Sequence, residues 1–231
     1  MQDAMQDAFK TWDAAGETLE AVEARIHDGV PREKLHERAA GYARRVLRAA
    51  PWLHVNRADT IVEVGPGVGY IMQAVAEQSG AAAITGLDVA PSMIAHAQAR
   101  LQRDGLSPDR FRFQHYDGAR FPWPDETVDL FYSVAAIQHI PKPHAYNVFL
   151  EMHRCLRRRG TSVVHLLSWD FVARHQFDFA AEIRRQVAGV HTHWHHFYDR
   201  TELETILQHV LKAATFRFDE EHGSIWMAWQ K

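Results

Sequence analysis

The stretch TIVEVGPGVGY, residues 60–70, decides how the rest of the chain is interpreted. Its apolar, β-branched start, Ile61–Val64, predicts a short buried strand. Three glycines on alternate positions, Gly65, Gly67 and Gly69, follow before a helical pattern begins. Glycines in such a loop let a ligand approach the backbone closely, because no Cβ atoms stand in the way. The stretch therefore predicts a strand–loop–helix unit that binds a cofactor.

Composition sets the broad class of the protein. The chain has 231 residues, of which 46% are hydrophobic, so it can bury a full core as one domain. Its net charge of −3 gives no positive field that would attract nucleic acid. A single cysteine, Cys155, excludes an internal disulfide and a multi-cysteine metal site. With neither an N-terminal signal segment nor an apolar run of about 18 residues, we expect a cytoplasmic protein without a membrane span.

Two helices are predicted ahead of the first strand. Apolar residues recur at steps of three and four across residues 3–27, and again across 32–50 until Pro51 ends the pattern. These helices are candidates for a cap over the cofactor site. They could equally pack against one face of a sheet.

From residue 60 onward, strand and helix patterns alternate. Strands are expected at residues 61–64, 83–87, 111–115, 128–133 and 162–167, with a helix over 143–157 that ends at Gly160. Such alternation predicts a doubly wound, parallel α/β sheet with right-handed crossovers.

The last quarter of the chain departs from this rhythm. Residues 170–188 are predicted to be helical, and Thr201 followed by Glu204 is a capping-box signal for a further helix. Residues 214–218 and 224–229 read as two strands joined by a short turn, and strands joined in this way are antiparallel. The sheet is therefore expected to end in a hairpin.

The glycine loop alone leaves two kinds of nucleotide cofactor open. In both, an acidic residue at the end of the second strand, here Asp88, accepts hydrogen bonds from a ribose diol. Dinucleotide sites use the pattern Gly-x-Gly-x-x-Gly. In this chain the third glycine comes one residue early, and Tyr70 occupies the position that the dinucleotide pattern reserves for glycine.

A resemblance to a known family adds to this interpretation. Residues 63–69 resemble the first motif of class I S-adenosylmethionine (SAM)-dependent methyltransferases, and residues 86–93 resemble the second. Residues 117–130 are similar to the ubiquinone-biosynthesis-like (methyltransferase type 11) branch, and residues 137–140 and 151–156 follow in the order of the family. The family often has Lys-Pro-Gly-Gly where this chain has Arg157–Gly160, which suggests a local loop difference.

The resemblance implies a fold and a division of the chain. The fold is a doubly wound, mostly parallel seven-stranded Rossmann-like sheet with an antiparallel C-terminal hairpin and an N-terminal helical cap. Residues 1–231 would form one methyltransferase domain. Within it, 1–57 would hold the N-terminal helices, 58–168 the SAM-binding core, 169–200 an acceptor-pocket insertion, and 201–231 the terminal helix and hairpin.

The resemblance also assigns cofactor contacts by position. Asp88 would bind the ribose hydroxyls, Asp117 would accept from the adenine amine, and Glu63 would orient the glycine loop. Alternatively, the two aspartates only cap helices or turns. The residues that would contact SAM are Glu63, Gly65, Gly67, Gly69, Asp88, Val89, Asp117, Gly118, Ser133 and Val134.

Histidines are the candidate catalytic groups. SAM carries an activated methyl group, so the protein must mainly align the acceptor and, for a hydroxyl, supply a base such as histidine. His139 lies near the methyl group in the family, where it is often structural. A base or substrate hydrogen bond is also predicted from His195, His196 or Tyr198, whereas His165 is expected in the core.

Other side chains bear on the same site. The alternation of His191, His193 and His195 is a metal-ligand spacing, but without a neighbouring carboxylate we expect no metal. Trp12, Tyr42 and Trp169 are candidates to line the acceptor cavity or to be ordinary core residues.

Several acceptors are disfavoured by the sequence. Methylases of planar nitrogens carry Asn/Asp-Pro-Pro-aromatic after the fourth strand, where this chain has Ser133–Ala136. Cys155 lies on the wrong element for pyrimidine C5 methylation, and a nucleic acid would require a basic surface. We therefore predict methyl transfer from SAM to a small molecule, favouring a hydroxyl of a sugar-like or aromatic compound. The alternatives are a non-catalytic scaffold with this fold and a nicotinamide-dependent oxidoreductase.

Overall fold

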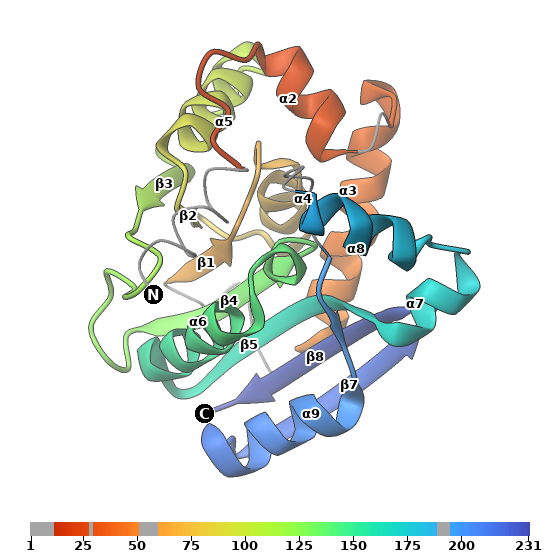
Figure 1. The fold of residues 1–231 in the computed structure, drawn as a ribbon. Helices are drawn as coiled ribbons and strands as arrows, with labels where there is room; N and C mark the ends of the chain where they lie inside the picture. The colour runs from red at the N-terminus through yellow and green to blue at the C-terminus, as the bar shows by residue number, and fades with distance from the viewer. Residues whose placement is uncertain (1–11, 28–29, 51–59, 189–194) are drawn as a thin grey trace.

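The computed structural model describes residues 12–27, 30–50, 60–188 and 195–231 (Figure 1). Eight strands of this part of the chain form one sheet. Their bounds are β1 Ile61–Val64, β2 Ile84–Asp88, β3 Phe111–His115, β4 Val128–Val134, β5 Leu156–Ser168, β6 Phe197–Tyr198, β7 Thr215–Glu221 and β8 Ser224–Gln230.

The sheet has the predicted topology. The order is β3-β2-β1-β4-β5-β8-β7, and the two-residue strand β6 pairs with β5. The β5–β8 and β7–β8 pairs are antiparallel, and the other pairs are parallel. The doubly wound α/β sheet and its terminal antiparallel hairpin are therefore confirmed.

Helices cover both faces of the sheet, as Figure 1 shows. Buried residues of α3, α4 and α5 belong to the hydrophobic core on one face, and those of α6 and α9 belong to the core on the other. The helices are α2 Leu19–Ile26, α3 Arg32–Ala49, α4 Tyr70–Ser79, α5 Pro91–Arg103, α6 Lys142–Cys155, α7 Trp169–Arg174, α8 Phe179–Val187 and α9 Arg200–Thr205, with a 3₁₀ turn at Ile137–His139 and a π-helical turn at Ile206–Val210. None of the described helices is long and apolar enough to cross a bilayer.

The burial of strand β1 explains why three of its four residues are apolar. All four of its residues are buried, because the strand is central and covered on both faces. Ile61 packs in the core of one face, whereas Val62 and Val64 pack in the core of the other. Glu63, on the same side as Ile61, is the exception and lies at the functional site.

The predicted continuous helix over 3–27 is wrong in the described part. Residues 12–18 are not helical, and Gly16 has a φ of 83°, which a helix cannot accommodate. The helix α2 begins only at Leu19, where the Thr18 side chain accepts a hydrogen bond of 3.2 Å from the Ala21 amide. Residues 3–11 of this prediction lie outside the described residues.

Helix α3 agrees with the prediction for 32–50. Its inner face buries Leu35, Ala39, Ala43 and Val46 in the core that also contains residues of α4. Part of the N-terminal region therefore packs on the sheet face. Another part, described below, borders the site.

The predicted helix stop at Gly160 is also wrong. Helix α6 ends at Cys155, and β5 starts at once, with Leu156 paired to Val128 before the register shifts. A Cβ at Gly160 would lie 2.9 Å from the carbonyl oxygens of both Arg157 and Val128. The glycine is therefore required by close backbone packing within the sheet.

Two further predictions need correction in the C-terminal part. The segment 170–188 forms two helices, α7 and α8, and Gln176 between them has a φ of 50°. Helix α9 is capped by Asp199, whose carboxylate accepts a 2.9 Å hydrogen bond from the Glu202 amide. Asp199 therefore takes the role that the capping-box pattern assigned to Thr201.

Candidate functional site

A cavity opens where the order of the strands reverses. Strands β1 and β4 are neighbours, but their chain connections run to opposite sides, which makes this the switch point where doubly wound sheets bind ligands. The cavity, called here the glycine-loop cavity, has about 1270 Å³ of empty space counting its mouth. It is lined by Trp12, Ile26, His27, Leu35, Arg38, Ala39, Tyr42, Glu63, Val64, Gly65, Pro66, Gly67, Tyr70, Ile71, Leu87, Asp88, Val89, Met93, Tyr116, Val134, Ala135, Ala136, Ile137, His139 and Ile140.

The glycine loop brings its backbone against neighbouring segments. A Cβ at Gly65 would lie 2.5 Å from the Ala136 Cβ, and the Gly65 φ of 70° is itself unfavourable for other residues. A Cβ at Gly67 would lie 3.2 Å from the Ile26 Cδ1 of α2. Side chains at these positions would fill the space between the loop and the walls of the cavity. The loop is thus a cradle whose fit depends on glycine, as a closely held cofactor requires.

Glu63 places a buried carboxyl group in this cavity. The residue is 1% exposed, and burial raises its pKa to about 8, against the opposing effect of the Tyr132 hydroxyl and the Met72 amide. A positively charged amine bound nearby would favour the ionised form. Glu63 is therefore suited to hold a ligand ammonium group.

Asp88 stands at the end of β2, where it both caps α5 and lines the cavity, and its contact with a ribose diol stays a prediction. Its Oδ1 accepts a 3.0 Å hydrogen bond from the Ala90 amide at the start of α5, and the residue also lines the glycine-loop cavity. Burial raises the pKa of Asp88 to about 6, although the Ala90 and Val89 amides oppose the rise. Val89 and two residues without a predicted role, Met93 and Tyr116, add apolar wall beside it.

Four predicted cofactor residues are not among the described residues that line the cavity: Gly69, Asp117, Gly118 and Ser133. Asp117 is exposed, and its Oδ1 accepts from the Ala119 and Arg120 amides at 2.8 and 3.0 Å. The buried Ser133 hydroxyl donates to the Val64 carbonyl at 2.8 Å. These contacts shape the loops around the cavity. A direct contact of the four residues with a cofactor stays a prediction.

A second cavity adjoins the first and is called the histidine cavity. It has about 1140 Å³ of empty space counting its mouth. Six residues line both cavities: Trp12, Ile26, Arg38, Tyr42, Ala135 and His139. The others that line the histidine cavity are Arg25, Arg45, Gln138, His165, Leu167, Phe171, His195, Glu221, His222, Ser224 and Trp226.

Two predicted catalytic histidines meet at the junction of the cavities. The His139 ring lies 4.6 Å from the His195 ring and 5.0 Å from the Trp12 ring, measured between centroids. His196 and Tyr198 are not among the described residues that line either cavity. The Tyr198 side chain is buried in the core, and the Lys142 Nζ lies 4.8 Å from the centroid of its ring. Their placement favours His139 and His195 for a role at the site.

His165 is both a core residue, as expected, and part of the floor of the histidine cavity. It is 5% exposed, and its ring lies 4.8 Å from the Trp226 ring. Burial lowers the pKa of His165 to about 3, and the positive charges of Arg45 and Arg38 act in the same direction. The imidazole is therefore neutral at physiological pH.

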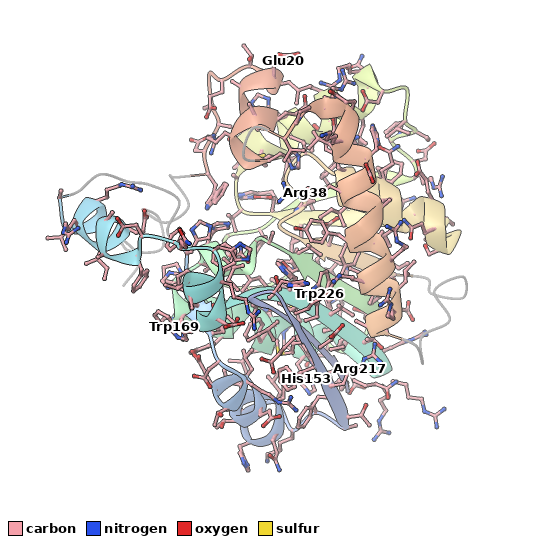
Figure 2. The ribbon with its side chains drawn as sticks, turned by 90° about the vertical axis from the view of Figure 1, so that its right-hand side faces the viewer. Glu20, Arg38, His153, Trp169, Arg217 and Trp226 are labelled. Atoms are coloured by element: carbon pink, nitrogen blue, oxygen red, sulfur yellow. The ribbon has the colours of Figure 1, made fainter. Side chains whose placement is uncertain are left out.

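The site also contains residues that the sequence interpretation overlooked. Arg38 and Arg45 lie on α3 together with Tyr42, at positions i, i+7 and i+4 of one helix face. That spacing is the signal that could have identified them. Trp12 and Tyr42 line the cavity as proposed. Trp169, labelled in Figure 2, is 49% exposed. Its ring contacts the rings of Phe179 and Phe197.

The described residues contain no group of three or more histidine, cysteine or carboxylate side chains that could hold a metal ion. The alternating run of histidines is only partly covered by this observation, because His191 and His193 lie outside the described residues.

Comparison with known proteins agrees with the fold and the glycine loop. Residues 61–160 match the family described as Methyltransferase domain. Phosphatidylethanolamine N-methyltransferase from Cereibacter sphaeroides is 30% identical over 112 residues, which cover 48% of this chain and 52% of that protein. The chain thus spans about half the length of this relative. Malonyl-[acyl-carrier protein] O-methyltransferase from a Marinomonas species is 28% identical over 121 residues, covering 52% of this chain and 43% of that protein.

Solved structures show the same fold. A SAM-dependent methyltransferase from Aquifex aeolicus superposes with a TM-score of 0.59 at 15% identity, covering 89% of this chain and 96% of that one. At this identity the likeness shows the fold, and the match to the methyltransferase-domain family covers residues 61–160.

Proposed function

We propose that the chain is a class I SAM-dependent methyltransferase and that it transfers the methyl group of SAM to a hydroxyl of a small sugar-like or aromatic molecule. The observation that carries this proposal is the shared wall of the two cavities. The glycine-loop cavity has the features of a cofactor site, and His139 and Ala135 separate it from a second, polar space.

The residues of the glycine-loop cavity fit SAM. The glycine cradle admits a closely held ligand, Glu63 suits an ammonium group, and Asp88 offers a carboxylate to a ribose diol. Bound SAM would supply a methyl group on a sulfonium, which is activated for in-line displacement. The chain itself must then hold the acceptor in line and exclude competing water.

The histidine cavity supplies the acceptor side. The rings of Trp12, Tyr42 and Trp226 form walls against which a sugar or an aromatic ring can pack. Phe171 and His195 line it from the segment 169–200, which supports the view of that segment as an acceptor-pocket insertion. The names of the two relatives specify different acceptors, phosphatidylethanolamine and malonyl-[acyl-carrier protein], so neither name assigns the acceptor of this chain.

His139 is proposed as the group that accepts the hydroxyl proton. It borders both cavities and is therefore the histidine that can face an acceptor hydroxyl beside the cofactor. A positioned base of this kind contributes about 10²–10⁴-fold to the rate. His195, next to it, would orient the His139 ring or the acceptor.

The test combines cofactor binding with turnover. We expect calorimetry to show binding of S-adenosylhomocysteine, and a panel of catechols and sugars to yield S-adenosylhomocysteine when incubated with SAM. His139→Gln should lower kcat about 100-fold or more for a hydroxyl acceptor while leaving cofactor affinity within about threefold. The control is His209→Gln, because His209 is exposed and is not among the residues that line either cavity. Absence of cofactor binding would refute the function, and an unchanged kcat in His139→Gln would refute the role of the base.

A further inference from the structure

The histidine cavity carries an excess of positive charge. Its charged lining residues are Arg25, Arg38, Arg45 and Glu221. Arg25 pairs with Glu17 at 2.9 Å, and Arg45 pairs with Glu221. Among the described residues, no carboxylate forms an ion pair with Arg38, whose Nη1 donates only to the His27 carbonyl at 3.3 Å. One guanidinium is thus left for a ligand.

Arg38 is also well placed to meet a ligand. Its guanidinium carbon lies 5.8 Å from the centroid of the Tyr42 ring, and the residue lines both cavities. Figure 2 shows Arg38 and Trp226 beside α3, the helix that forms this wall. Arg45 lies two turns further along the same face, with its guanidinium carbon 5.8 Å from the centroid of the Trp226 ring. The two arginines therefore frame an aromatic wall.

Two buried polar side chains that line the same cavity as the arginines have atoms without a hydrogen-bond partner among the described residues. Gln138 is 5% exposed, and its Oε1 has no hydrogen-bond partner among the described residues. The same holds for the Nδ1 of His165 on the floor of the cavity. Unpaired buried groups of this kind are costly unless a ligand or water reaches them. The cavity is therefore suited to bind a polar molecule, and its positive potential favours a negatively charged one.

We propose that the acceptor carries a carboxylate or phosphate group, and that Arg38 binds this oxyanion in the histidine cavity, while Arg45, paired with Glu221, adds to the positive potential of the same wall. A guanidinium pairs with either group through two parallel hydrogen bonds. The planar body of the acceptor would then lie along Tyr42 and Trp226, with its reacting hydroxyl toward His139. This inference rests on the proposed function and narrows its substrate class to small acidic molecules.

The experiment uses acceptors in matched pairs. Catechol is compared with 3,4-dihydroxybenzoate for the carboxylate, and glucose with glucose 6-phosphate for the phosphate. We expect the acidic member of one pair to have a kcat/KM about tenfold or more above its neutral partner. Arg38→Gln should remove most of this preference through KM, whereas Arg45→Gln should reduce it less, because Glu221 already pairs with Arg45. Arg44→Gln, an exposed arginine of the same helix that is not among the residues lining either cavity, is the matched control and should retain the preference.

Cofactor binding separates this inference from the proposed function. S-adenosylhomocysteine affinity is measured for every variant and should stay within about threefold of wild type. If Arg38→Gln weakens it about tenfold and leaves the acid preference intact, Arg38 serves the cofactor and the inference is overturned.

A binding arm covers the case in which no acceptor of the panel turns over. Benzoate, phenyl phosphate and benzyl alcohol are titrated by calorimetry into protein saturated with S-adenosylhomocysteine. Tighter binding of an anion than of the alcohol, lost in Arg38→Gln, supports the inference. Equal binding of all three overturns it, whereas failure of wild type to bind S-adenosylhomocysteine refutes the proposed function instead.

Discussion

The Tyr70 hydroxyl donates a 2.8 Å hydrogen bond to the Glu23 carboxylate, which also accepts hydrogen bonds of 2.8 and 3.0 Å from Arg103. Tyr70 is the first residue of α4, directly after the glycine loop, and Glu23 lies on α2. Three residues beyond Glu23, Ile26 faces Gly67 and lines both cavities. The hydrogen bond therefore fixes the helix that borders the site to the loop that would hold the cofactor.

Loss of this link should loosen both elements. Glu23→Gln removes the charge that Arg103 and Tyr70 surround, and we expect a loss of about 1–2 kcal/mol in the free energy of unfolding. S-adenosylhomocysteine binding should weaken about three- to tenfold, because Ile26 and His27 of this region line the cavity. Calorimetry and chemical denaturation measure the two effects.

The matched control is Glu20→Gln on the same helix. Glu20 is exposed and lies at the outer edge of the molecule in Figure 2. It should change stability by less than about 0.5 kcal/mol and leave cofactor affinity unchanged. If Glu23→Gln behaves like this control, α2 is not held through Glu23.

A pair of glycines separates backbone strain from steric fit. Gly65 and Gly80 both have a φ of 70°, but a Cβ at Gly65 would clash with Ala136 at 2.5 Å, whereas a Cβ at Gly80 meets nothing within 4 Å. We expect Gly80→Ala to cost about 1 kcal/mol of stability and to retain cofactor binding. Gly65→Ala should cost more and weaken S-adenosylhomocysteine binding at least about tenfold. Equal affinities of the two variants would show that the loop tolerates a side chain.

Glu63 predicts a stability that depends on pH. Its pKa rises on folding from 4.5 to about 8, so between these values the folded state keeps a proton that the unfolded state has released. The free energy of unfolding should therefore fall as pH rises through this window. In Glu63→Gln it should fall less, because the contribution of the Glu63 carboxyl group is absent. The melting temperatures of both proteins at about pH 5.5 and about pH 8.5 provide the test. A difference between the two proteins that is the same at both pH values would contradict the assignment.

The sequence predicted the fold because the deciding signals are local. The apolar run Ile61–Val64 and the glycine loop each span only a few residues, and each strand or helix that follows is indicated by its own short pattern. The structure confirms this alternation of strands and helices. The errors occur where tertiary contacts override a local pattern. Gly160 was interpreted as a helix stop, but it serves the close approach of the Arg157 and Val128 carbonyls, which belong to different strands.

The site was predictable only in part for the same reason. The glycine-loop cavity is mostly built from motifs that are continuous in sequence, so Glu63, Gly65, Gly67, Asp88 and Val89 could be selected. The histidine cavity is assembled from α2, α3, β5, α7, β7, β8 and several connecting segments that meet only in the fold. Its arginines were overlooked because charged residues along one side of a helix are typical of a solvated face. The structure shows instead that Arg38 lines a cavity together with the buried side chains of His165 and Trp226.

Asp88 carries the last prediction, which concerns cofactor affinity. Its pKa of about 6 in the folded protein means that its carboxylate loses its charge below neutral pH, and a ribose diol donates more strongly to the ionised form. S-adenosylhomocysteine should therefore bind about tenfold more weakly at about pH 5 than at about pH 7, provided that the ionised form is the one that binds. Asp88→Asn should bind weakly throughout and lack this step, whereas the exposed Asp109→Asn should keep it. Protonation of Glu63, whose pKa is about 8, also lowers affinity below pH 8 and should persist in Asp88→Asn, so the contribution of Asp88 is the difference in pH dependence between wild type and this variant. A wild-type affinity that does not change between about pH 5 and about pH 7 would show that Asp88 only caps α5.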